Sequence, residues 1–452
     1  MINEEFIHSG SYYIFIHNLN TMRVYFDTIG CRLNQAEIER YAAQFTALGH
    51  KIVPDAASAD IAVVNTCSVT AAAASDSRGK VRNAAKDGAQ VVVTGCWSSM
   101  EPQEAAAMEG VSQVIPNAEK DSLTAAVLGL EKADFDTEPL KRVTLPGVHA
   151  RTRAFIKIQD GCDNHCSFCV TRLVRGKARS VDKARVLHDV RSAISAGGKE
   201  IVLTGVNLGA WGLDLDPAEE LADLIEFLLK ETDIPRIRLS SLESWNLSDR
   251  FLQLWEDPRM CPHFHLPLQS GSDSVLKRMV RRTTLGEFRR LVETALSIDP
   301  AFAITTDVIA GFPGGSDEEH AQTLAFVDSL PFAGGHIFPY SPRPGTAAAR
   351  MKDQVPTAVQ KERAKQLRDL FEQKTLAFET SFIGSVRQVL WESTQQLPDG
   401  QWETHGLSEN YLTVKTIFPT PVRNRIDSVR ISGRQDGKLI GIVIPDSREG
   451  EK

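Results

Sequence analysis

The chain has 452 residues, of which 42% are hydrophobic and 24% charged, and its formal net charge is −7. This length predicts two to four domains, and the composition is ordinary for a soluble globular protein. No apolar run reaches the ~18 residues that a membrane span requires, which excludes a helical membrane protein. The negative net charge disfavours a large nucleic-acid surface.

Seven cysteines are spread along the chain, and the first residues lack the basic start and clean apolar core of a signal peptide. This pattern predicts a reducing, cytoplasmic compartment and argues against a disulfide framework. The run Met22-Arg23-Val24-Tyr25-Phe26 is a more natural beginning than Met1. We therefore expect residues 1–21 to be a dispensable extension or the result of a start codon assigned too early.

Residues 22–138 are predicted to form an α/β domain, because short apolar strands alternate with helices. Asn34 and Glu37 have capping-box spacing at the first helix start. Such alternation predicts a parallel sheet whose right-handed crossovers place all strand C-termini on one edge. Strands are expected at 24–28, 61–65 and 91–94, and helices near 34–48, 71–86 and 102–108.

Cys31, Cys67 and Cys96 each follow one of these strands by one to three residues. Ligands of open α/β sheets bind at that edge, so three cysteines distant in sequence can converge there. Thiolates select iron–sulfur centres, and three of them leave one iron of a cubane cluster open. The alternative is that these are unrelated buried cysteines, which are common. Cys261 is interpreted as structural or incidental.

A polar stretch at Glu138–Gly147 breaks the pattern and predicts a domain boundary. Strand–helix alternation then resumes over residues 148–378. Six units predict a partial (β/α)6 barrel, since a full eight-unit barrel typically has ~250 residues. Strands are expected at 154–159, 200–204, 236–240, 263–268, 303–310 and 335–340, and helices near 182–196, 221–231, 247–255, 285–296, 317–329 and 356–378.

The first barrel strand leads into Gly161-Cys162-Asp163-Asn164-His165-Cys166-Ser167-Phe168-Cys169, a C-x3-C-x2-C motif. These three thiolates predict a second cluster with an open iron, where chemistry can occur. The alternatives are a zinc knuckle or a disulfide loop. Zinc usually takes four ligands, and His165 is poorly placed to be one of them.

Other candidate ligand contacts lie after the barrel strands, where barrel chemistry is found. Glycines allow close approach to the backbone, and polar side chains can bond a ribose or an amino-acid head. Each could instead simply form a turn. The cofactor-binding candidates are Gly205, Asn207, Glu243, Gln269, Ser270 and Gly311, together with Phe168 beside the last cysteine.

Two basic clusters contrast with the acidic whole. Residues 141–191 hold twelve Lys and Arg against four Asp, and a second cluster spans residues 277–290. Either alone is typical of a solvated face, but together they favour a polyanionic substrate. Residues 379–445 contain short β-like runs at 385–391, 411–416, 428–432 and 439–443, which predict a small β-barrel. The end, residues 446–452, is expected to fray.

The cysteine motif with Phe168 before its last cysteine resembles the radical S-adenosylmethionine (SAM) superfamily, in which the open iron chelates SAM and cleavage of SAM yields a 5′-deoxyadenosyl radical. Two three-cysteine sets, a barrel and a terminal β module together resemble the radical SAM methylthiotransferases, over nearly everything from Met22 onward. The motifs that carry this resemblance are Thr28-Ile29-Gly30-Cys31-Arg32-Leu33-Asn34-Gln35, Asn65-Thr66-Cys67-Ser68-Val69-Thr70, Val93-Thr94-Gly95-Cys96, His265-Leu266-Pro267-Leu268-Gln269-Ser270-Gly271-Ser272, Tyr340-Ser341-Pro342-Arg343-Pro344-Gly345-Thr346 and the TRAM-like Gly406-Leu407-Ser408-Glu409-Asn410-Tyr411.

The resemblance implies two 4Fe–4S clusters and two uses of SAM, converting C–H to C–S–CH3. Cys162, Cys166 and Cys169 would hold the radical-generating cluster. Cys31, Cys67 and Cys96 would hold the sulfur-delivering one. A reductant protein such as flavodoxin or ferredoxin and a sulfur donor would be needed as partners, but no membrane.

Gly30–Gln35 and Arg175-Gly176-Lys177-Ala178-Arg179-Ser180 resemble the branch that acts on N6-threonylcarbamoyladenosine at position 37 of tRNA, beside the anticodon. Arg175, Lys177 and Arg179 are the candidate RNA phosphate contacts. The alternatives are the branches that modify isopentenyl-adenosine in tRNA or an aspartate of a ribosomal protein. A non-enzymatic iron–sulfur protein that binds RNA or senses redox state is a further alternative.

Overall fold

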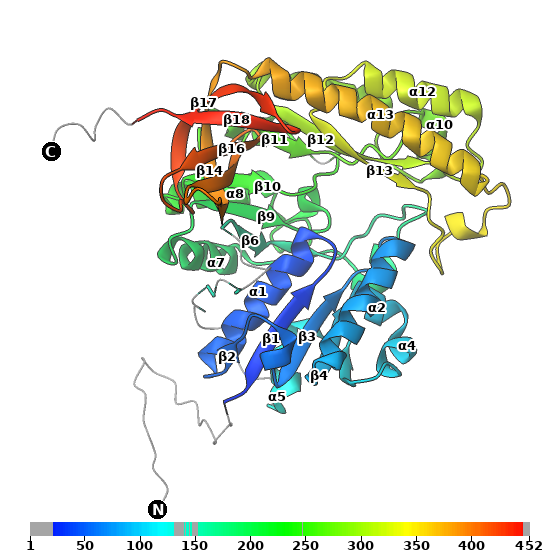
Figure 1. The fold of residues 1–452 in the computed structure, drawn as a ribbon. Coiled ribbons are helices and arrows are strands. Elements are labelled where there is room, and N and C mark those ends of the chain that lie inside the picture. The colour runs from blue at the N-terminus through cyan, green and yellow to red at the C-terminus, as the bar shows by residue number, and fades with distance from the viewer. Residues whose placement is uncertain are drawn as a thin grey trace, which may run out of the picture.

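The computed structural model describes residues 21–130, 140, 142, 143, 145, 146, 152–245 and 247–445. Outside these residues lie the predictions for residues 1–20 of the extension, for residues 138, 139, 141, 144 and 147 of the boundary and for the end at 446–452. The described parts have the predicted α/β class. Figure 1 shows an N-terminal sheet below a larger barrel, with a small β-barrel at one side.

The N-terminal sheet is fully parallel, with strand order β2-β1-β3-β4-β5. Apolar side chains cover both faces of its central strands, as expected for a parallel sheet between helices. The strands are β1 (Arg23–Thr28), β2 (Lys51–Ile52), β3 (Ile61–Thr66), β4 (Gln90–Gly95) and β5 (Val111–Ile115), and the helices are α1 (Arg32–Ala47), α2 (Ala71–Lys86), α3 (Cys96–Met100), α4 (Pro102–Ala106) and α5 (Leu123–Leu128).

The three predicted strands of this sheet are confirmed, whereas β2 and β5 were not predicted. β2 has only two residues, and β5 carries a central Ser–Gln pair that interrupts its apolar run. The predicted cap at Asn34 is wrong, because Cys31 occupies the N-cap position of α1. Asn34 instead lies in the first turn and donates hydrogen bonds to the carbonyls of Ile29 and Thr66.

Six parallel strands form the larger barrel as two three-stranded sheets, β6-β9-β10 and β11-β12-β13. An isolated parallel bridge from Ser241 to His265 joins them, so the six strands follow one another in chain order. All six were predicted. They are β6 (Ala154–Lys157), β9 (Glu200–Thr204), β10 (Arg236–Leu239), β11 (His263–His265), β12 (Ala303–Ala310) and β13 (Gly334–Pro339).

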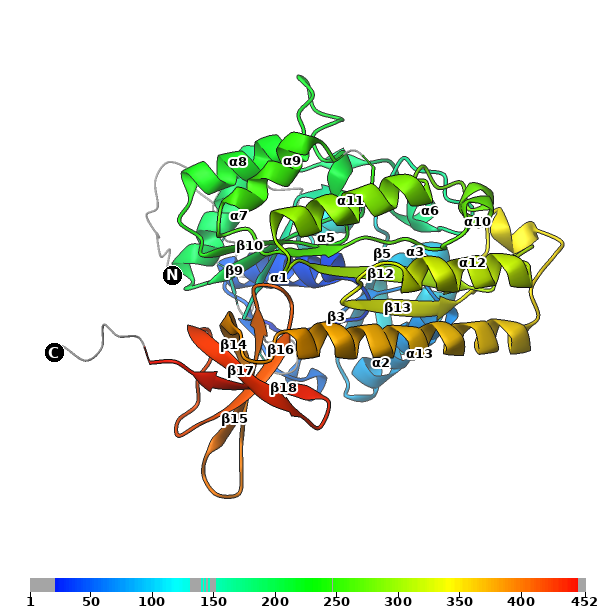
Figure 2. The same cartoon turned by 90° about the horizontal axis from the view of Figure 1, so that it is seen from above.

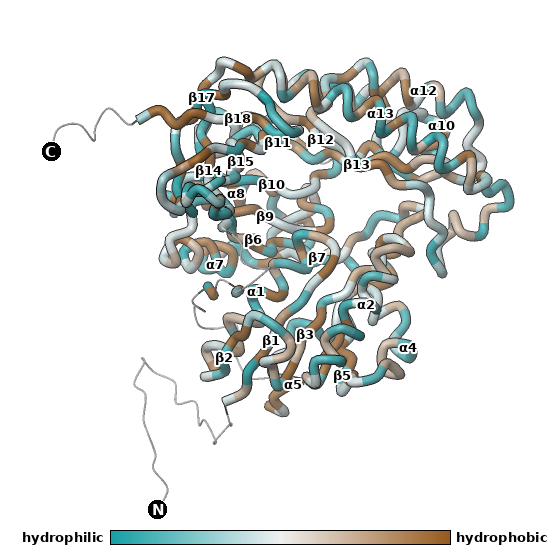
Figure 3. The backbone as a smooth tube through the Cα atoms, in the orientation of Figure 1, coloured by the Kyte–Doolittle hydropathy of each residue, from teal (hydrophilic) through white to brown (hydrophobic). Residues whose placement is uncertain are grey.

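Helices cover the outer face of these strands and share one hydrophobic core with them. Figure 2 shows α7, α8, α9 and α11 along one side, while α13 packs against β12 and β13. Hydrophobic and hydrophilic residues alternate along α12 and α13 in Figure 3, as expected of helices with one buried face. The helices are α6 (Thr171–Arg175), α7 (Lys183–Ser195), α8 (Leu221–Glu231), α9 (Asp249–Gln253), α10 (Asp273–Arg278), α11 (Leu285–Ile298), α12 (Asp317–Asp328) and α13 (Thr357–Ser381).

The C-terminal part is a closed five-stranded barrel with order β14-β15-β16-β18-β17. Its core includes Val389, Trp391 and Val429. The sequence predicted four of its strands and missed β15, whose residues are mostly polar. The strands are β14 (Val386–Gln396), β15 (Trp402–Ser408), β16 (Thr413–Phe418), β17 (Ile426–Gln435) and β18 (Lys438–Val443). Among the described residues, no helix combines the length and apolar character needed to cross a bilayer.

Candidate active site

The first cysteine set lies on the loop after β6 and after the short strand β7 (Gln159–Asp160). Gly161 has φ +68°, and a Cβ there would overlap the carbonyl oxygen of Lys177. The amide of Cys162 donates to the carbonyl of Gly176 at 3.1 Å, which fixes the start of the loop. Only glycine allows the two backbone segments to approach this closely.

The thiols of Cys162, Cys166 and Cys169 influence one another. Burial raises the pKa of each, and the neighbouring cysteines of the set raise it further. Bound iron would have to displace these protons, as it does at any thiolate site. The three side chains are therefore grouped as the spacing predicted.

Arg281 stands behind the first set. Its side chain is only 2% exposed, and it donates to both carboxylate oxygens of Glu243, at 3.0 and 2.5 Å. It also approaches Cys166 Sγ at 3.9 Å and lies 4.6 Å from the ring centre of Trp245. Arg281 therefore fixes the predicted ligand contact Glu243 beside the cysteine loop. No sequence pattern indicated this role, because Arg281 was one member of a basic cluster.

The second cysteine set lies at the C-terminal edge of the N-terminal sheet. Cys67 and Cys96 directly follow β3 and β4, and Cys31 is the third residue after β1. Burial raises the pKa of Cys67 to about 12, with contributions from the thiols of Cys31 and Cys96. Desolvation by the surrounding protein raises the pKa of the Cys31 thiol as well, and the nearby thiol of Cys96 raises it further. The three thiols therefore converge, as the parallel sheet predicted.

Small and amide side chains surround the second set. A Cβ on Gly30 would lie 2.7 Å from Cys67 Cβ, so this glycine permits the convergence. Asn117 Nδ2 donates to Cys96 Sγ at 3.7 Å, and Cys31 Sγ lies 3.6 Å from Asn34 Oδ1. Sequence reasoning missed Asn117, which carries no motif and follows β5.

Arg175, from the end of α6, connects the two sets. Its Nε donates to Cys96 Sγ at 3.3 Å and its Nη2 to Asn34 Oδ1 at 2.6 Å. Its Nη1 donates to Glu37 and to Asp160, each at 3.0 Å. Asp160 immediately precedes the loop of the first set. One side chain therefore touches the second set and the base of the first.

The predicted RNA contact at Arg175 is wrong in this structure, because its side chain is 3% exposed and donates to four protein acceptors. Lys177 and Arg179 are exposed and remain candidates. The pair β7 and β8 (Arg179–Ser180) is antiparallel and places Arg179 opposite Asp160. The two exposed cations therefore lie beside the first cysteine loop.

Lys120 and Lys157 complete the charge network around Arg175. Lys120 contacts Glu37 at 2.6 Å and also pairs with Asp160, and Lys157 lies 3.0 Å from Asp160. Burial by itself raises the pKa of Glu37, but Arg175, Lys120 and Lys157 lower it to about 2. The same cations hold the pKa of Asp160 well below its usual range despite its burial. Both carboxylates are therefore ionised between the sheet and the barrel.

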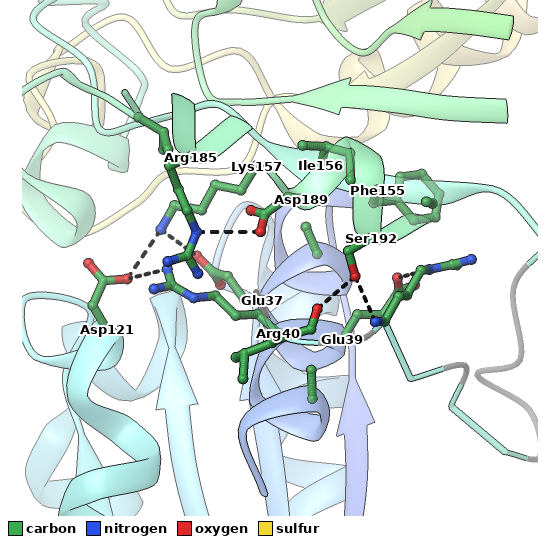
Figure 4. A pocket seen from close by; sticks show the side chains of 16 residues that line it. Glu37, Glu39, Arg40, Asp121, Phe155, Ile156, Lys157, Arg185, Asp189 and Ser192 are labelled. Atoms are coloured by element: carbon green, nitrogen blue, oxygen red, sulfur yellow. Dashed lines mark hydrogen bonds and ion pairs between the residues drawn. The ribbon is translucent and has the colours of Figure 1, made fainter. Parts of the chain in front are cut away.

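A cavity of about 90 Å³ lies beside this charge network, between α1, β6 and α7. In Figure 4, Lys157 and Asp121 face one another across it, and Arg185 pairs with Asp189. None of the six cluster cysteines lines it. The cavity is therefore distinct from the cysteine sites.

The predicted SAM contacts divide into two groups. Asn207 is buried, and its side-chain Oδ1 has no partner among the described residues. Its backbone N–H donates to the side-chain oxygen of Gln159. Gln269 takes φ +69° and pairs with β12. By contrast, Ser270 bonds Thr323 of α12, and Gly311 packs on Gln360 of α13. Ser270 and Gly311 thus have packing partners that account for them.

Three further positions complete this end of the barrel. Gly205 lies against Gln159, and Phe168 packs edge-on against Phe312 with ring centres 6.4 Å apart. Ser240 Oγ is buried and has no partner among the described residues, like Asn207 Oδ1. Buried polar atoms of this kind normally bond something, so they fit a ligand at the strand ends. The sequence placed Ser240 at a strand end, but no pattern singled it out from its neighbours as a ligand contact.

No three His, Cys, Asp or Glu side chains of the described chain are arranged to hold a single metal ion. A cubane cluster has a different requirement, because each cysteine binds a different iron. The donors of each cysteine set fit a cubane cluster: each set has three thiols and no carboxylate. An arginine lies beside each set, Arg175 near Cys96 and Arg281 near Cys166.

The fold and the three-cysteine loop define the class: a radical SAM barrel joined to an α/β sheet domain. Residues 156–327 match the family described as "Radical SAM superfamily", and residues 23–116 match "Uncharacterized protein family UPF0004". The radical SAM methyltransferase TsrM from Kitasatospora setae shares the fold, with a TM-score of 0.56 at 13% identity over 73% of this chain and 77% of that one.

Named relatives are much closer in sequence. Threonylcarbamoyladenosine tRNA methylthiotransferase MtaB of Thermotoga maritima is 37% identical, over 83% of this chain and 87% of its own. The Aquifex aeolicus protein of that name is 34% identical, over 94% and 100%. The tRNA-2-methylthio-N(6)-dimethylallyladenosine synthase of Erythrobacter litoralis is also 34% identical, over 85% and 89%.

The chain therefore belongs to the radical SAM methylthiotransferase family, as its motifs predicted. It is an enzyme of tRNA modification by this relationship, and the superfamily implies SAM and one 4Fe–4S cluster. The second cluster, the individual site residues, the domain limits and the compartment stay predictions.

Proposed function

We propose that this chain attaches a methylthio group to C2 of N6-threonylcarbamoyladenosine, beside the anticodon of tRNA. The observation that carries the proposal is that Arg175 bonds both Cys96 of the sheet's cysteine set and Asp160, two residues before Cys162 of the barrel's set. Relatives named for this substrate match over most of the chain. The segments Gly30–Gln35 and Arg175–Ser180 have the form of that branch.

The residues present fit two 4Fe–4S clusters. Cys162, Cys166 and Cys169 would hold one, and Cys31, Cys67 and Cys96 the other. The seventh cysteine, Cys261, is buried beside Arg238 and Glu200 and belongs to neither set. When bound, the clusters and SAM supply hydrogen abstraction and sulfur transfer, which side chains alone cannot perform on an aromatic carbon.

The chain's own residues bind and orient. We assign the amino-acid head and ribose of SAM to Glu243, Asn207 and Gln269 at the strand ends. Arg281 holds Glu243 by two hydrogen bonds, so the carboxylate presents a fixed orientation. Gly205 acts indirectly, because the space that its missing Cβ leaves is filled by the side chains of Gln159 and Leu208.

The remaining residues act indirectly in this proposal. Phe168, Ser270 and Gly311 keep the surrounding loops in place through Phe312, Thr323 and Gln360. Lys177 and Arg179 are the proposed phosphate contacts, which give affinity without base selectivity. A reductant protein such as flavodoxin or ferredoxin and a sulfur donor are further expected partners.

The test compares tRNA nucleosides by mass spectrometry in a deletion strain, with and without the gene restored. Restoration should produce 2-methylthio-threonylcarbamoyladenosine, and the Cys31→Ala variant should not. Accumulation of 2-methylthio-isopentenyl-adenosine would instead assign isopentenyl-adenosine in tRNA as the substrate. Methylthiolation of a ribosomal aspartate would also contradict the proposal.

An anaerobic assay with SAM and a chemical reductant separates the remaining alternative. An enzyme of this class forms 5′-deoxyadenosine, and the Cys162→Ala variant should form none. Absence of 5′-deoxyadenosine from the intact, cluster-loaded chain would favour a non-enzymatic RNA-binding or redox-sensing protein.

A further inference from the structure

Arg175 is built into the second cysteine site from another part of the chain. The sheet provides Cys31, Cys67 and Cys96, but the guanidinium that bonds Cys96 Sγ comes from α6, after the first cysteine loop. The same guanidinium bonds Asn34, whose Oδ1 lies beside Cys31 Sγ. It thus reaches two of the three cysteine positions, one directly and one through an amide.

Backbone contacts fix Arg175 to the first cysteine set. The next residue, Gly176, accepts the hydrogen bond of the Cys162 amide. Asp160, one residue before Gly161, accepts from Arg175 Nη1. A shift of α6 would therefore move the base of the first loop and the cation at the second set together.

The buried charges around Arg175 do not balance. Arg175, Lys120 and Lys157 face two buried carboxylates, Glu37 and Asp160, while Asp121 contacts Lys157 from a half-exposed position. Among the residues that the structure describes, the buried part of this network therefore has one positive charge in excess, and Arg175 carries its charge to within 3.3 Å of a cysteine sulfur. A cation at this distance favours an anionic cluster over an empty site.

We propose that Arg175 is a positioning residue for the second cluster: it completes that cluster's site from the barrel by its hydrogen bond to the sulfur of Cys96. This inference rests on the proposed function, because it presumes that the second set holds a cluster. Groups around a metal's ligands often decide how tightly the metal is held and at what potential it is reduced. Arg281, near Cys166, is its counterpart at the first set.

The test uses the full chain with Cys162, Cys166 and Cys169 replaced by Ala, so that only the second set can hold iron. Iron and sulfide are loaded anaerobically, iron per chain is followed under a chelator, and the reduced cluster is examined by electron paramagnetic resonance. Arg175→Lys keeps the charge against both carboxylates, so the chain should fold. A single ammonium cannot bond Cys96, Asn34 and both carboxylates together.

We expect Arg175→Lys to release the second cluster about tenfold faster under the chelator. Its reduction potential should become more negative, because a hydrogen bond to sulfur is lost. Lys120→Met is the matched control within the network: Lys120 pairs with the same carboxylates but touches no cysteine. Arg281→Lys is the control at the other set. Both should retain the cluster as the parent chain does, whatever their melting temperatures.

Unchanged retention and potential in Arg175→Lys would overturn the inference, and so would an equal loss in Lys120→Met, which would indicate a purely structural network. A parent chain that holds no iron gives a different result: it refutes the second cluster of the proposed function itself. The two failures are therefore distinguishable in one experiment.

Discussion

At the scale of single residues, Gly161 determines how the first cysteine loop begins. Its positive φ and the missing Cβ allow the backbone to pass the Lys177 carbonyl oxygen. The neighbouring Gly176 also has a positive φ, of +78°, but no atom lies within 4 Å of where its Cβ would be. Comparing substitutions at the two glycines therefore distinguishes the effect of backbone strain, which both share, from that of steric overlap, which occurs only at Gly161.

We predict that Gly161→Ala displaces the Cys162 loop and lowers iron by about four atoms per chain, one cubane cluster. Gly176→Ala carries a backbone penalty of about 1–3 kcal/mol, because φ +78° with ψ −159° is a region used almost only by glycine, but its Cβ meets no neighbour, so this variant should keep its iron. Iron analysis after anaerobic loading checks both variants. Full iron content in Gly161→Ala would show that the loop tolerates the displacement.

At the scale of elements, the segment from α6 to β8 has two faces. Arg175 points inward to the cysteines, whereas Lys177 and Arg179 are exposed only a few residues later. Pairing of β8 with β7 keeps the exposed cations beside the first cysteine loop. This element therefore combines a contact to the cluster site with a surface suited to a phosphate backbone.

We predict that the double variant Lys177→Ala, Arg179→Ala weakens tRNA binding about tenfold at low salt. The slope of log affinity against log salt should fall by about one to two, because up to two phosphate contacts are lost. Formation of 5′-deoxyadenosine without tRNA should stay unchanged. Lys230→Ala, an exposed lysine on α8, is the control and should alter neither. Loss of SAM cleavage in the double variant would contradict this assignment.

At the scale of the whole molecule, buried arginines join the small β-barrel to the rest. Arg238 donates to the carbonyls of Ser408 and Glu409, at 3.1 and 3.0 Å, and to Glu200 of β9. Tyr411 stacks on His263 and accepts a hydrogen bond from Arg32, the residue after Cys31, at 2.6 Å. The sheet, the barrel and the small β-barrel therefore meet at Tyr411.

Glu200 makes the contact between the larger barrel and the small β-barrel sensitive to pH. Burial alone raises the pKa of Glu200, but Arg238 and Arg153 lower it to about 2. The unfolded value is about 4.3, so the stabilisation is complete above that pH and is lost as pH falls toward 2. The free energy of unfolding should drop by about 2 kcal/mol more in the wild type than in Glu200→Gln between pH 6 and pH 3.

Denaturant unfolding of the metal-free chain at the two pH values measures this difference. Glu226→Gln is a suitable control, because Glu226 pairs with Arg250 on the surface, where both side chains are more than 40% exposed. Its pH response should match that of the wild type. Equal responses in Glu200→Gln and wild type would remove Glu200 from this role.

Much of the fold follows from local patterns. The apolar runs of β1, β3, β4 and the six barrel strands predict buried parallel strands, and the long helices lie where apolar spacing placed them. Sequence patterns do not predict a strand that forms only because neighbouring strands pair with it. β15 is mostly polar, yet the small barrel closes only by pairing it with β14 and β16.

The sequence by itself determined which thiols are available for the proposed chemistry: six cysteines in two sets of three, with the first set grouped by spacing and the second by its strand ends. Only the tertiary structure decided what surrounds them. Arg175 looked like a surface cation, but α6 and the docking of the sheet turn it toward Cys96 and Glu37. The reason is physical: spacing along the chain fixes which atoms are available, whereas burial and long-range charge pairing depend on how distant segments pack.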